Sequence, residues 1–253
     1  MEEALTRATV PKLLVANWKL NPQIEAEAVR LARASDAKNI VIAPPFPFLV
    51  AVGKALKRAT LGAQDVFWKL HGAYTGGVSP LMLRALGVRY VIVGHSERRA
   101  LGETDTMVNK KARAALRAGL APILCVGEPL AVRRKGLAAA KRFVAHQLRA
   151  DLRGVSPSSV ISHQSLVVAY EPLWAIGTGR AATPADAAEM AEFIKGLLVK
   201  SYKLKVSVLY GGSVNVRNAG AFLAEPAIDG ALVGGASLQA AEFRKMISIN
   251  QRS

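Results

Sequence analysis

The sequence is poor in cysteine and in acidic residues, and it has no long unbroken apolar run. Its 253 residues include one cysteine, Cys125, which excludes an intramolecular disulfide and a metal site made of several cysteines. The longest apolar stretch, 40–53, contains three prolines and is shorter than the roughly 20 residues that a membrane helix needs. Residues 1–12 lack the apolar core of a secretory signal. We therefore expect a soluble protein located in the cytoplasm.

The chain carries a large excess of positive charge. It has 34 Lys and Arg residues against 18 Asp and Glu residues, which gives a net charge of +16. Because 51% of the residues are apolar, this charge does not indicate a disordered polyelectrolyte. The cations are scattered and lack interleaved aromatic residues, so we do not expect specific nucleic-acid binding. Nonspecific binding to nucleic acid or anionic membranes stays open, and a positive field would also attract a small dianionic substrate.

Short β-branched runs recur along the chain, and several are apolar almost throughout. That pattern is typical of parallel strands buried on both faces. The predicted strands cover 13–18, 39–44, 60–64, 90–95, 121–127, 166–172, 206–212 and 229–235, and helical spacing is clearest at 24–33, 106–118, 137–152 and 185–199. Thr183 and Pro184 form a cap signal at the start of the last of these helices.

Strands that alternate with helices in this way predict a (β/α)8 barrel of class α/β. We expect one domain over residues 1–253, with 1–10 as an N-terminal extension, because no linker or composition break interrupts the chain. The alternative is an open doubly wound sheet. It has less support because neither a GxGxxG sequence after the first strand nor a P-loop pattern is present.

Chemically capable side chains lie at the ends of three of the predicted strands. Asn17 and Lys19 lie at the end of the first strand, His95 and Glu97 at the end of the fourth, and Glu171 at the end of the sixth. Alone, a strand-end histidine is more often structural, and a lone glutamate is more often a solvated loop charge. In a parallel barrel, however, the carboxyl ends of all strands meet at one face, where catalytic groups lie. The five residues together therefore predict a catalytic site.

Glycine-rich turns follow the last two predicted strands. Ser213 lies after the seventh strand, and Gly234 and Gly235 lie after the eighth. A single glycine there would indicate only a turn. Because glycine lets backbone N–H groups approach an anion, and because this end of a barrel commonly binds phosphate, the set predicts a phosphate site.

These segments, taken together, resemble the triosephosphate isomerase family. The matching motifs are ANWKLN (16–21), GHSERR (94–99), CVGE (125–128), AYEPLWAIGTGR (169–180), YGGSV (210–214) and LVGGASL (232–238). They span essentially the whole chain in the family's order, and AYEPLWAIGTG is the most specific. The resemblance implies a single-domain TIM barrel that interconverts D-glyceraldehyde 3-phosphate and dihydroxyacetone phosphate through an enediolate, in glycolysis and gluconeogenesis. It implies no metal and no organic cofactor.

The resemblance also assigns roles to the catalytic candidates. Glu171 matches the general base, and His95 matches the neutral imidazole that polarises the carbonyl and shuttles protons. Lys19 matches the cation that stabilises the enediolate, Asn17 the amide donor beside it, and Glu97 a carboxylate close to the lysine. The chemistry requires such a set, because the proton next to a carbonyl is a weak acid and the oxyanion must be stabilised where it forms. The family is itself a standard example of a neutral histidine and of a base beneath a closing loop.

The same comparison assigns the phosphate contacts and a lid. The implied backbone donors to phosphate are Gly177, Ser213, Gly234 and Gly235. Residues 172–182 match the lid, with Trp174 in its first hinge. Ile176 and Leu232 match apolar residues that close over the base and exclude water.

The family resemblance further implies a homodimer. Thr75 matches a residue that reaches the active site of the neighbouring subunit. The sequence departs from the family pattern nearby: Gly77 stands where a glutamate usually pairs with the arginine matching Arg98, and Asp65 replaces a common asparagine. These changes put one interface ion pair in doubt.

Two alternative functions have less support from the sequence. A basic anion-binding barrel that has lost catalysis would not need Asn17, Lys19, His95 and Glu171 all to be intact. A Schiff-base aldolase would need a lysine inside a strand, and Lys19 lies just beyond one.

His71, His146 and His163 lack metal-ligand spacing. We expect them on the surface or in packing, with Cys125 as a core thiol and 133–153 as a solvated basic helix face.

Overall fold

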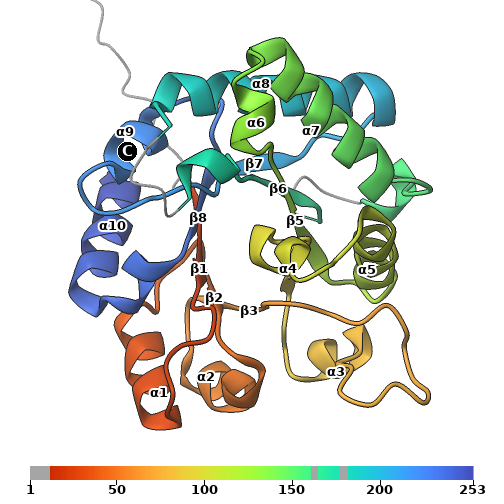
Figure 1. Ribbon diagram of the computed structural model, residues 1–253. Coiled ribbons are helices and arrows are strands. Elements are labelled where there is room, and N and C mark those ends of the chain that lie inside the picture. The colour runs from red at the N-terminus through yellow and green to blue at the C-terminus, as the bar shows by residue number, and fades with distance from the viewer. Residues whose placement is uncertain (1–11, 161–164, 177–181, 253) are drawn as a thin grey trace, which may run out of the picture.

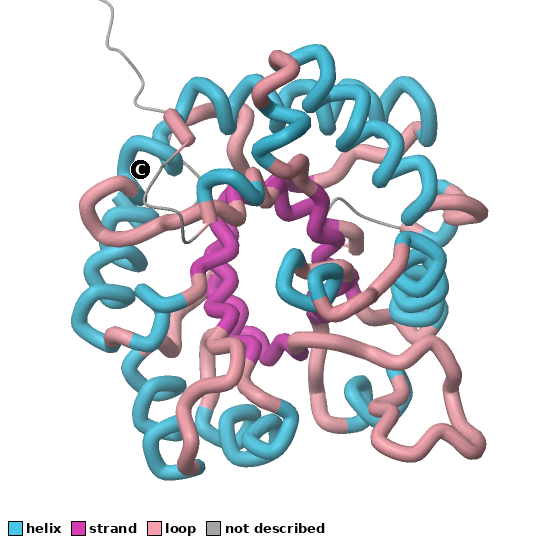
Figure 2. Tube along the Cα trace, in the orientation of Figure 1, coloured by secondary structure: helices cyan, strands magenta, loops and turns pink. Residues whose placement is uncertain are grey.

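Eight parallel strands form a closed barrel, as the sequence predicted. The computed structural model describes residues 12–160, 165–176 and 182–252. Each strand pairs with its neighbour in the sequence, and β8 pairs with β1, which closes the ring. Figure 2 shows this ring with the helices around its outside. The strands are β1 (Leu13–Asn17), β2 (Ile40–Ala43), β3 (Thr60–Ala63), β4 (Tyr90–Val93), β5 (Ala121–Val126), β6 (Val167–Tyr170), β7 (Ser207–Tyr210) and β8 (Gly230–Val233).

The helices lie between successive strands and cover the barrel (Figure 1). They are α1 (Glu25–Ala34), α2 (Leu49–Ala55), α3 (Pro80–Ala85), α4 (Ser96–Ala100), α5 (Asp105–Arg117), α6 (Leu130–Arg133), α7 (Leu137–Asp151), α8 (Pro184–Tyr202), α9 (Ala219–Ala224) and α10 (Ala240–Arg252). Short 3-10 turns are η1 (Phe46–Phe48), η2 (Pro157–Ser159), η3 (Leu173–Ala175) and η4 (Gly235–Leu238). The four helices expected from the sequence are present, with ends that differ by at most three residues.

The strands are apolar throughout because both of their faces are buried. Alternate residues such as Val15, Ile123 and Leu209 pack together inside the barrel. Their neighbours along the strands, such as Leu14 and Leu124, pack outward against the helices. Cys125 is buried in the inner cluster, as predicted for a core thiol. Side chains therefore fill the barrel, and a site can form only at its ends.

The predicted cap of α8 is present in full. The Thr183 hydroxyl accepts a hydrogen bond from the backbone N–H of Asp186 (3.1 Å), and the Asp186 carboxylate accepts one from the Thr183 N–H (3.4 Å). Pro184 occupies the first turn, where no N–H is needed. This capping box fixes where the chain re-enters helix after the segment 177–181, which lies outside the described residues.

One surface prediction was wrong. Arg133 was expected on a solvated face, but its side chain is only 18% exposed. Its guanidinium lies 5.1 Å from the centre of the Trp174 ring and pairs with Asp186 at 2.5 Å. His71 and His146 are exposed, as expected, and His163 lies outside the described residues. Within the described part of the chain, no helix is both long and apolar enough to cross a membrane.

Candidate active site

The carboxyl ends of the strands bring the predicted catalytic residues around one cavity of about 340 Å³. Asn17 and Lys19 reach it from β1, His95 and Glu97 from β4, and Glu171 from β6. The cavity is also lined by Ile176, Gly211, Gly212, Ser213, Val214, Leu232, Gly234 and Gly235. Residues far apart in sequence therefore converge as the barrel topology requires.

Glu171 is a buried carboxylate held at the start of α4. Its side chain is 2% exposed, although it follows directly after β6. Its Oε2 atom accepts a hydrogen bond of 2.9 Å from the backbone N–H of Ser96, the first residue of α4. Its Oε1 atom lies 3.0 Å from Nε2 of His95. The Glu171 carboxylate is therefore held between the start of α4 and the His95 ring.

His95 caps α4 with its own ring. Its Nδ1 atom accepts a hydrogen bond from the backbone N–H of Glu97 (3.3 Å), which leaves Nε2 as the ring nitrogen that carries a proton. The start of α4 directly after His95 therefore fixes the tautomer of the ring. Burial alone lowers the pKa of His95, but contact with the Glu171 carboxylate and the charge of Glu97 outweigh it. The pKa of His95 is consequently raised above its ordinary value while Glu171 is in contact.

Lys19 is held in an unusual backbone conformation. Its φ angle is +54°, which is uncommon for any residue except glycine. The side-chain oxygen of Asn17 accepts the Lys19 N–H (3.1 Å), and the amide of Gln64 donates to the Lys19 carbonyl (2.8 Å). The Lys19 ammonium then lies 2.5 Å from Glu97 Oε1. Gln64 was not singled out from the sequence, although it directs the lysine into the cavity.

The glycines around the cavity leave room for these side chains. A Cβ atom at Gly234 would lie 3.2 Å from Cε of Lys19, and one at Gly211 would lie 2.9 Å from Cγ of Glu171. At Gly127 a Cβ atom would overlap the Glu171 backbone carbonyl. Gly211 and Gly127 were quoted within motifs but not assigned to the site. Both glycines leave space for Glu171, and this role depends on which strands lie next to each other in the barrel.

Three of the predicted phosphate residues, Ser213, Gly234 and Gly235, line the cavity. Gly234 and Gly235 follow β8, and η4 begins there. Ser213 follows β7, and its hydroxyl donates to the carbonyl of Ala175 (2.9 Å), which ties this turn to the first part of the lid segment. Gly177 lies outside the described residues.

The first hinge of the lid segment is anchored by buried polar groups. The Trp174 indole N–H donates to Oε1 of Glu128 (2.8 Å), a carboxylate that is fully buried and that also accepts from the Tyr170 hydroxyl. Ile176 and Leu232 both line the cavity beside Glu171. Two apolar residues therefore lie where they can exclude water from the base.

Thr75, like Trp174, is a predicted site residue that does not line this cavity. It is exposed on the loop between β3 and α3, where it lines a separate cavity of about 290 Å³ with Asp65, Gly77 and Arg98. In that cavity Asp65 pairs with Arg98 at 2.9 Å. Arg98 therefore has a carboxylate partner within its own chain.

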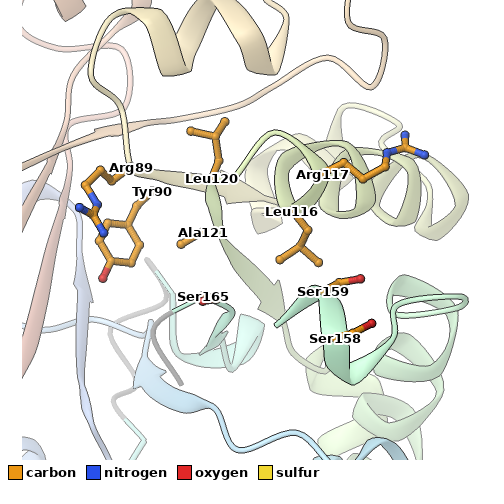
Figure 3. Close-up of a pocket in the computed structure, with 10 residues that line it drawn as sticks. Arg89, Tyr90, Leu116, Arg117, Leu120, Ala121, Ser158, Ser159 and Ser165 are labelled. Atoms are coloured by element: carbon orange, nitrogen blue, oxygen red, sulfur yellow. The ribbon is translucent and has the colours of Figure 1, made fainter. Parts of the chain in front are cut away.

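A further cavity of about 420 Å³ lies near the start of β4 and β5 (Figure 3). Tyr90, Ala121 and Leu116 line it, and none of the predicted site residues does. Among the residues that the structure describes, no group of three or more His, Cys, Asp or Glu side chains could hold a metal ion.

Comparison with known proteins gives a consistent result. Residues 12–250 match the family model described as triosephosphate isomerase. A triosephosphate isomerase of Thermoanaerobacter pseudethanolicus is 46% identical over 251 residues, which cover 93% of this chain and 98% of that protein. The enzyme of Moorella thermoacetica is 45% identical, with 94% and 98% covered, and that of Herpetosiphon aurantiacus is 44% identical, with 93% and 97% covered.

Proposed function

The chain belongs to the triosephosphate isomerase family, and we propose that the cavity at the carboxyl ends of its strands carries out the reaction, with Glu171 as base and His95 as electrophile. The reaction is the reversible isomerisation of D-glyceraldehyde 3-phosphate and dihydroxyacetone phosphate, an aldose–ketose interconversion of glycolysis and gluconeogenesis. The observation that supports these roles best is the meeting of Lys19, His95 and Glu171 around one cavity.

Glu171 removes the proton from the carbon next to the substrate carbonyl. Its carboxylate is buried, so its basicity does not have to compete with bulk water. The Ser96 N–H and His95 hold it, and the substrate carbonyl takes over the contact with His95 as Glu171 turns to the carbon. The same carboxyl group then returns the proton to the neighbouring carbon, which completes the isomerisation without a net change in protons.

His95 and Lys19 stabilise the oxyanion that forms. The Nε2–H of His95 donates to one oxygen and recovers a proton from the next, because Nδ1 is already occupied by the Glu97 N–H. Lys19 supplies the positive charge for the enediolate, with Asn17 fixing its backbone. Glu97 holds the Lys19 ammonium between turnovers.

The remaining predicted residues bind the phosphate and close the site. Backbone N–H groups at Gly177, Ser213, Gly234 and Gly235 bind the dianion, and Trp174 is a hinge for the lid. Ile176 and Leu232 cover the carboxylate. Pairing of Trp174 with Glu128 gives the hinge a fixed anchor, so closure can move the loop tip and leave the barrel unchanged.

The functional unit is a homodimer in which Thr75 approaches the partner's site. Large apolar side chains are exposed beside the catalytic loops: Leu20, next to Lys19, is 82% exposed, and Leu101, at the end of α4, is 86% exposed. Tyr74 and Met82 are exposed on the neighbouring loop and helix. Such an apolar surface supports contact with a second copy. The reaction requires neither metal nor organic cofactor.

The proposal also covers the domain organisation and the cellular location of the protein. The chain forms one barrel domain over 1–253, with 1–10 as an extension, and works in the cytoplasm on a phosphorylated small molecule. Limited proteolysis that yields an active core without the first residues, and cell fractionation, test these two points.

The decisive experiment measures isomerase turnover on D-glyceraldehyde 3-phosphate across a range of protein concentrations. We expect high turnover that falls on dilution as the dimer dissociates. Absence of turnover in folded protein would favour the anion-binding alternative. A covalent adduct trapped by borohydride in the presence of substrate would favour an aldolase, because only a Schiff base is trapped in that way.

A further inference from the structure

The outer face of α5 carries three cations in a row. Lys110, Arg113 and Arg117 are exposed and recur at helical spacing, so they form one stripe about 10 Å long. Trp68 and Lys69, from the loop after β3, complete the wall of a groove of about 270 Å³ with them. No carboxylate lines this groove among the residues that the structure describes.

The positive charges of the groove are not balanced by carboxylates among the described residues of its lining. None of Lys69, Lys110, Arg113 and Arg117 forms an ion pair with a described residue. Some other cations of the outer layer do have carboxylate partners: Arg98, Arg99, Lys111, Arg133, Lys141 and Lys195. Like charges at this spacing repel each other, and an external anion would relieve the repulsion.

An aromatic ring lies within the groove. The Lys110 ammonium is 5.7 Å from the centre of the Trp68 ring, and Trp68 is itself stacked on Phe67 with ring centres 4.2 Å apart. Trp68 is half-buried, so its position does not depend on a ligand. The groove therefore offers positive charge beside a fixed apolar wall.

The positive path continues beyond the groove. Arg117 also lines the cavity of about 420 Å³ near the start of β4, together with Arg89, Tyr90 and Leu120. Figure 3 shows Arg117 extending away from Tyr90 and Ala121, toward the outside of α5. Two recesses that share one arginine fit an extended anion better than a single small ion.

We propose that this basic groove, formed by Trp68, Lys69, Lys110, Arg113 and Arg117, binds the phosphate backbone of single-stranded nucleic acid without preference for base sequence. Cations at this spacing contact successive phosphates, and the one apolar wall, Trp68, gives an unstacked base a surface to pack against, as in other proteins that bind single strands. A duplex offers no such base, because its bases are stacked and paired. The groove shares no residue with the catalytic cavity, so binding and isomerisation are separate activities.

A membrane surface is a poorer fit to the same residues. Binding in the membrane interface needs large apolar side chains that protrude beside the cations. The apolar residues of α5, such as Val108 and Ala115, are buried against the barrel instead. The aromatic residue of the groove, Trp68, is recessed.

Fluorescence anisotropy of a labelled 12-nucleotide oligouridine, titrated with the full-length protein at several salt concentrations, tests the proposal. Four phosphate contacts predict that log K falls with log salt with a slope of about −3. The variant Lys110→Gln/Arg113→Gln/Arg117→Gln should bind at least about tenfold more weakly, with a slope shallower by about 2. Arg113→Gln alone should lie between the two.

A matched variant controls for net charge. Arg33→Gln/Lys200→Gln/Arg244→Gln removes the same charge from exposed positions on α1, α8 and α10 and should bind oligouridine as the wild type does. Both triple variants should retain isomerase turnover, which shows that they are folded. Equal weakening by the two triple variants, or tighter binding to duplex, to polyglutamate or to anionic phosphatidylserine vesicles than to the single strand, would overturn the proposal.

Discussion

Nε2 of His95 lies 3.0 Å from Oε1 of Glu171, so the proposed electrophile and the proposed base are direct neighbours. The contact raises the pKa of His95, against the opposite effect of burial. A protonated imidazole could not accept the Glu97 N–H at Nδ1, and it would be a poor proton shuttle. Movement of Glu171 toward the substrate therefore has a second effect, because it favours the neutral ring that the mechanism uses.

The first prediction concerns this coupling. In Glu171→Gln the pKa of His95 should fall below its wild-type value, because the largest influence that raises it is gone. Glu97→Gln should lower it less, since the Glu97 carboxylate lies 3.8 Å from Nδ1 and is half-exposed. NMR titration of the His95 ring in the three proteins measures both shifts. An unchanged pKa in Glu171→Gln would show that the contact does not control the ring.

The same pair sets a pH dependence of stability. A raised pKa in the folded state means that the His95–Glu171 contact stabilises fully below the unfolded pKa of His95, near 6.5, and that this contribution is lost as pH rises through the folded value. Urea unfolding of wild type and Glu171→Gln between pH 5 and pH 9 should therefore show a stability difference that is larger at the acidic end. A difference that grows with pH would contradict this sign.

Turnover should depend on Glu171 far more than folding does. Glu171→Gln keeps the shape of the side chain and removes the base, so kcat should fall by about 10³-fold while substrate binding is largely kept. Stopped assays on D-glyceraldehyde 3-phosphate, with circular dichroism as the check on folding, measure this. Near-normal turnover would remove Glu171 from the role of base.

Space beside the base should matter as much as its chemistry. A Cβ at Gly211 would lie 2.9 Å from Cγ of Glu171, so Gly211→Ala must displace the carboxylate and should lower kcat about 10- to 100-fold. Gly196 is the matched control: it lies inside α8, and a Cβ there would meet nothing within 4 Å. Gly196→Ala should leave kcat unchanged and stabilise the fold by about 0.5–1 kcal/mol.

These two glycines illustrate how far the sequence predicts the site. Apolar runs and strand-end positions predict the barrel and place Lys19, His95 and Glu171 at one face, because parallel strands in a closed sheet all end there. The steric role of Gly211 depends instead on register: Tyr170 of β6 lies opposite Tyr210 of β7, which brings the next residues, Glu171 and Gly211, together. No spacing along the chain contains that information.

Ion pairs between residues far apart in the chain could not be predicted from the sequence either. Arg133 looked like a surface cation in a basic helix, but it contacts Trp174 and Asp186, which lie before and after the segment 177–181 in the sequence. Lys111 is one of two adjacent lysines on α5, yet its side chain is buried between Asp65 and Glu103. The sequence shows which residues are charged. Which of these charges are paired with an opposite charge depends on how the loops and helices pack.

Two aspartates should show opposite effects of pH on stability. Burial raises the pKa of Asp151 to about 7 despite the Arg99 guanidinium 2.7 Å away. Its ionisation is therefore disfavoured by the fold, and this cost develops as pH rises from the unfolded pKa toward 7. Asp36 differs: burial raises its pKa, but hydrogen bonds from the backbone N–H groups of Lys57, Arg58 and Ala59 together outweigh burial and lower the pKa.

Urea unfolding across pH 3–8 distinguishes the two aspartates. Relative to wild type, Asp151→Asn should gain stability as pH rises from about 4 to about 7, because the variant has no carboxylate to ionise there. Asp36→Asn should lose stability relative to wild type as pH rises through the acidic range, because the stabilising carboxylate of the wild type then becomes ionised. Slopes of the same sign in both variants would contradict the assignment.

The final prediction concerns Gly77, where the family resemblance implies a glutamate partner for an arginine. In this chain Asp65 occupies that role: it lies 2.9 Å from Arg98 and 2.6 Å from Lys111, and Glu103 contacts the same two cations. The charges of these two carboxylates and two cations cancel, so the cluster needs no glutamate at position 77. Gly77 lines the same cavity as Asp65 and Arg98, so a carboxylate added there finds both cations already paired.

Gly77→Glu should therefore destabilise the protein, and Gly77→Glu/Asp65→Asn should recover the loss, with a coupling of about 1–2 kcal/mol between positions 65 and 77. Gly77→Ala isolates the cost of the side-chain stem, since a Cβ there lies 3.1 Å from the Tyr74 carbonyl oxygen. Urea unfolding gives the cycle, and sedimentation equilibrium shows whether dimer dissociation follows it. Additive effects of the two substitutions would mean that Asp65 does not take the place of the missing glutamate.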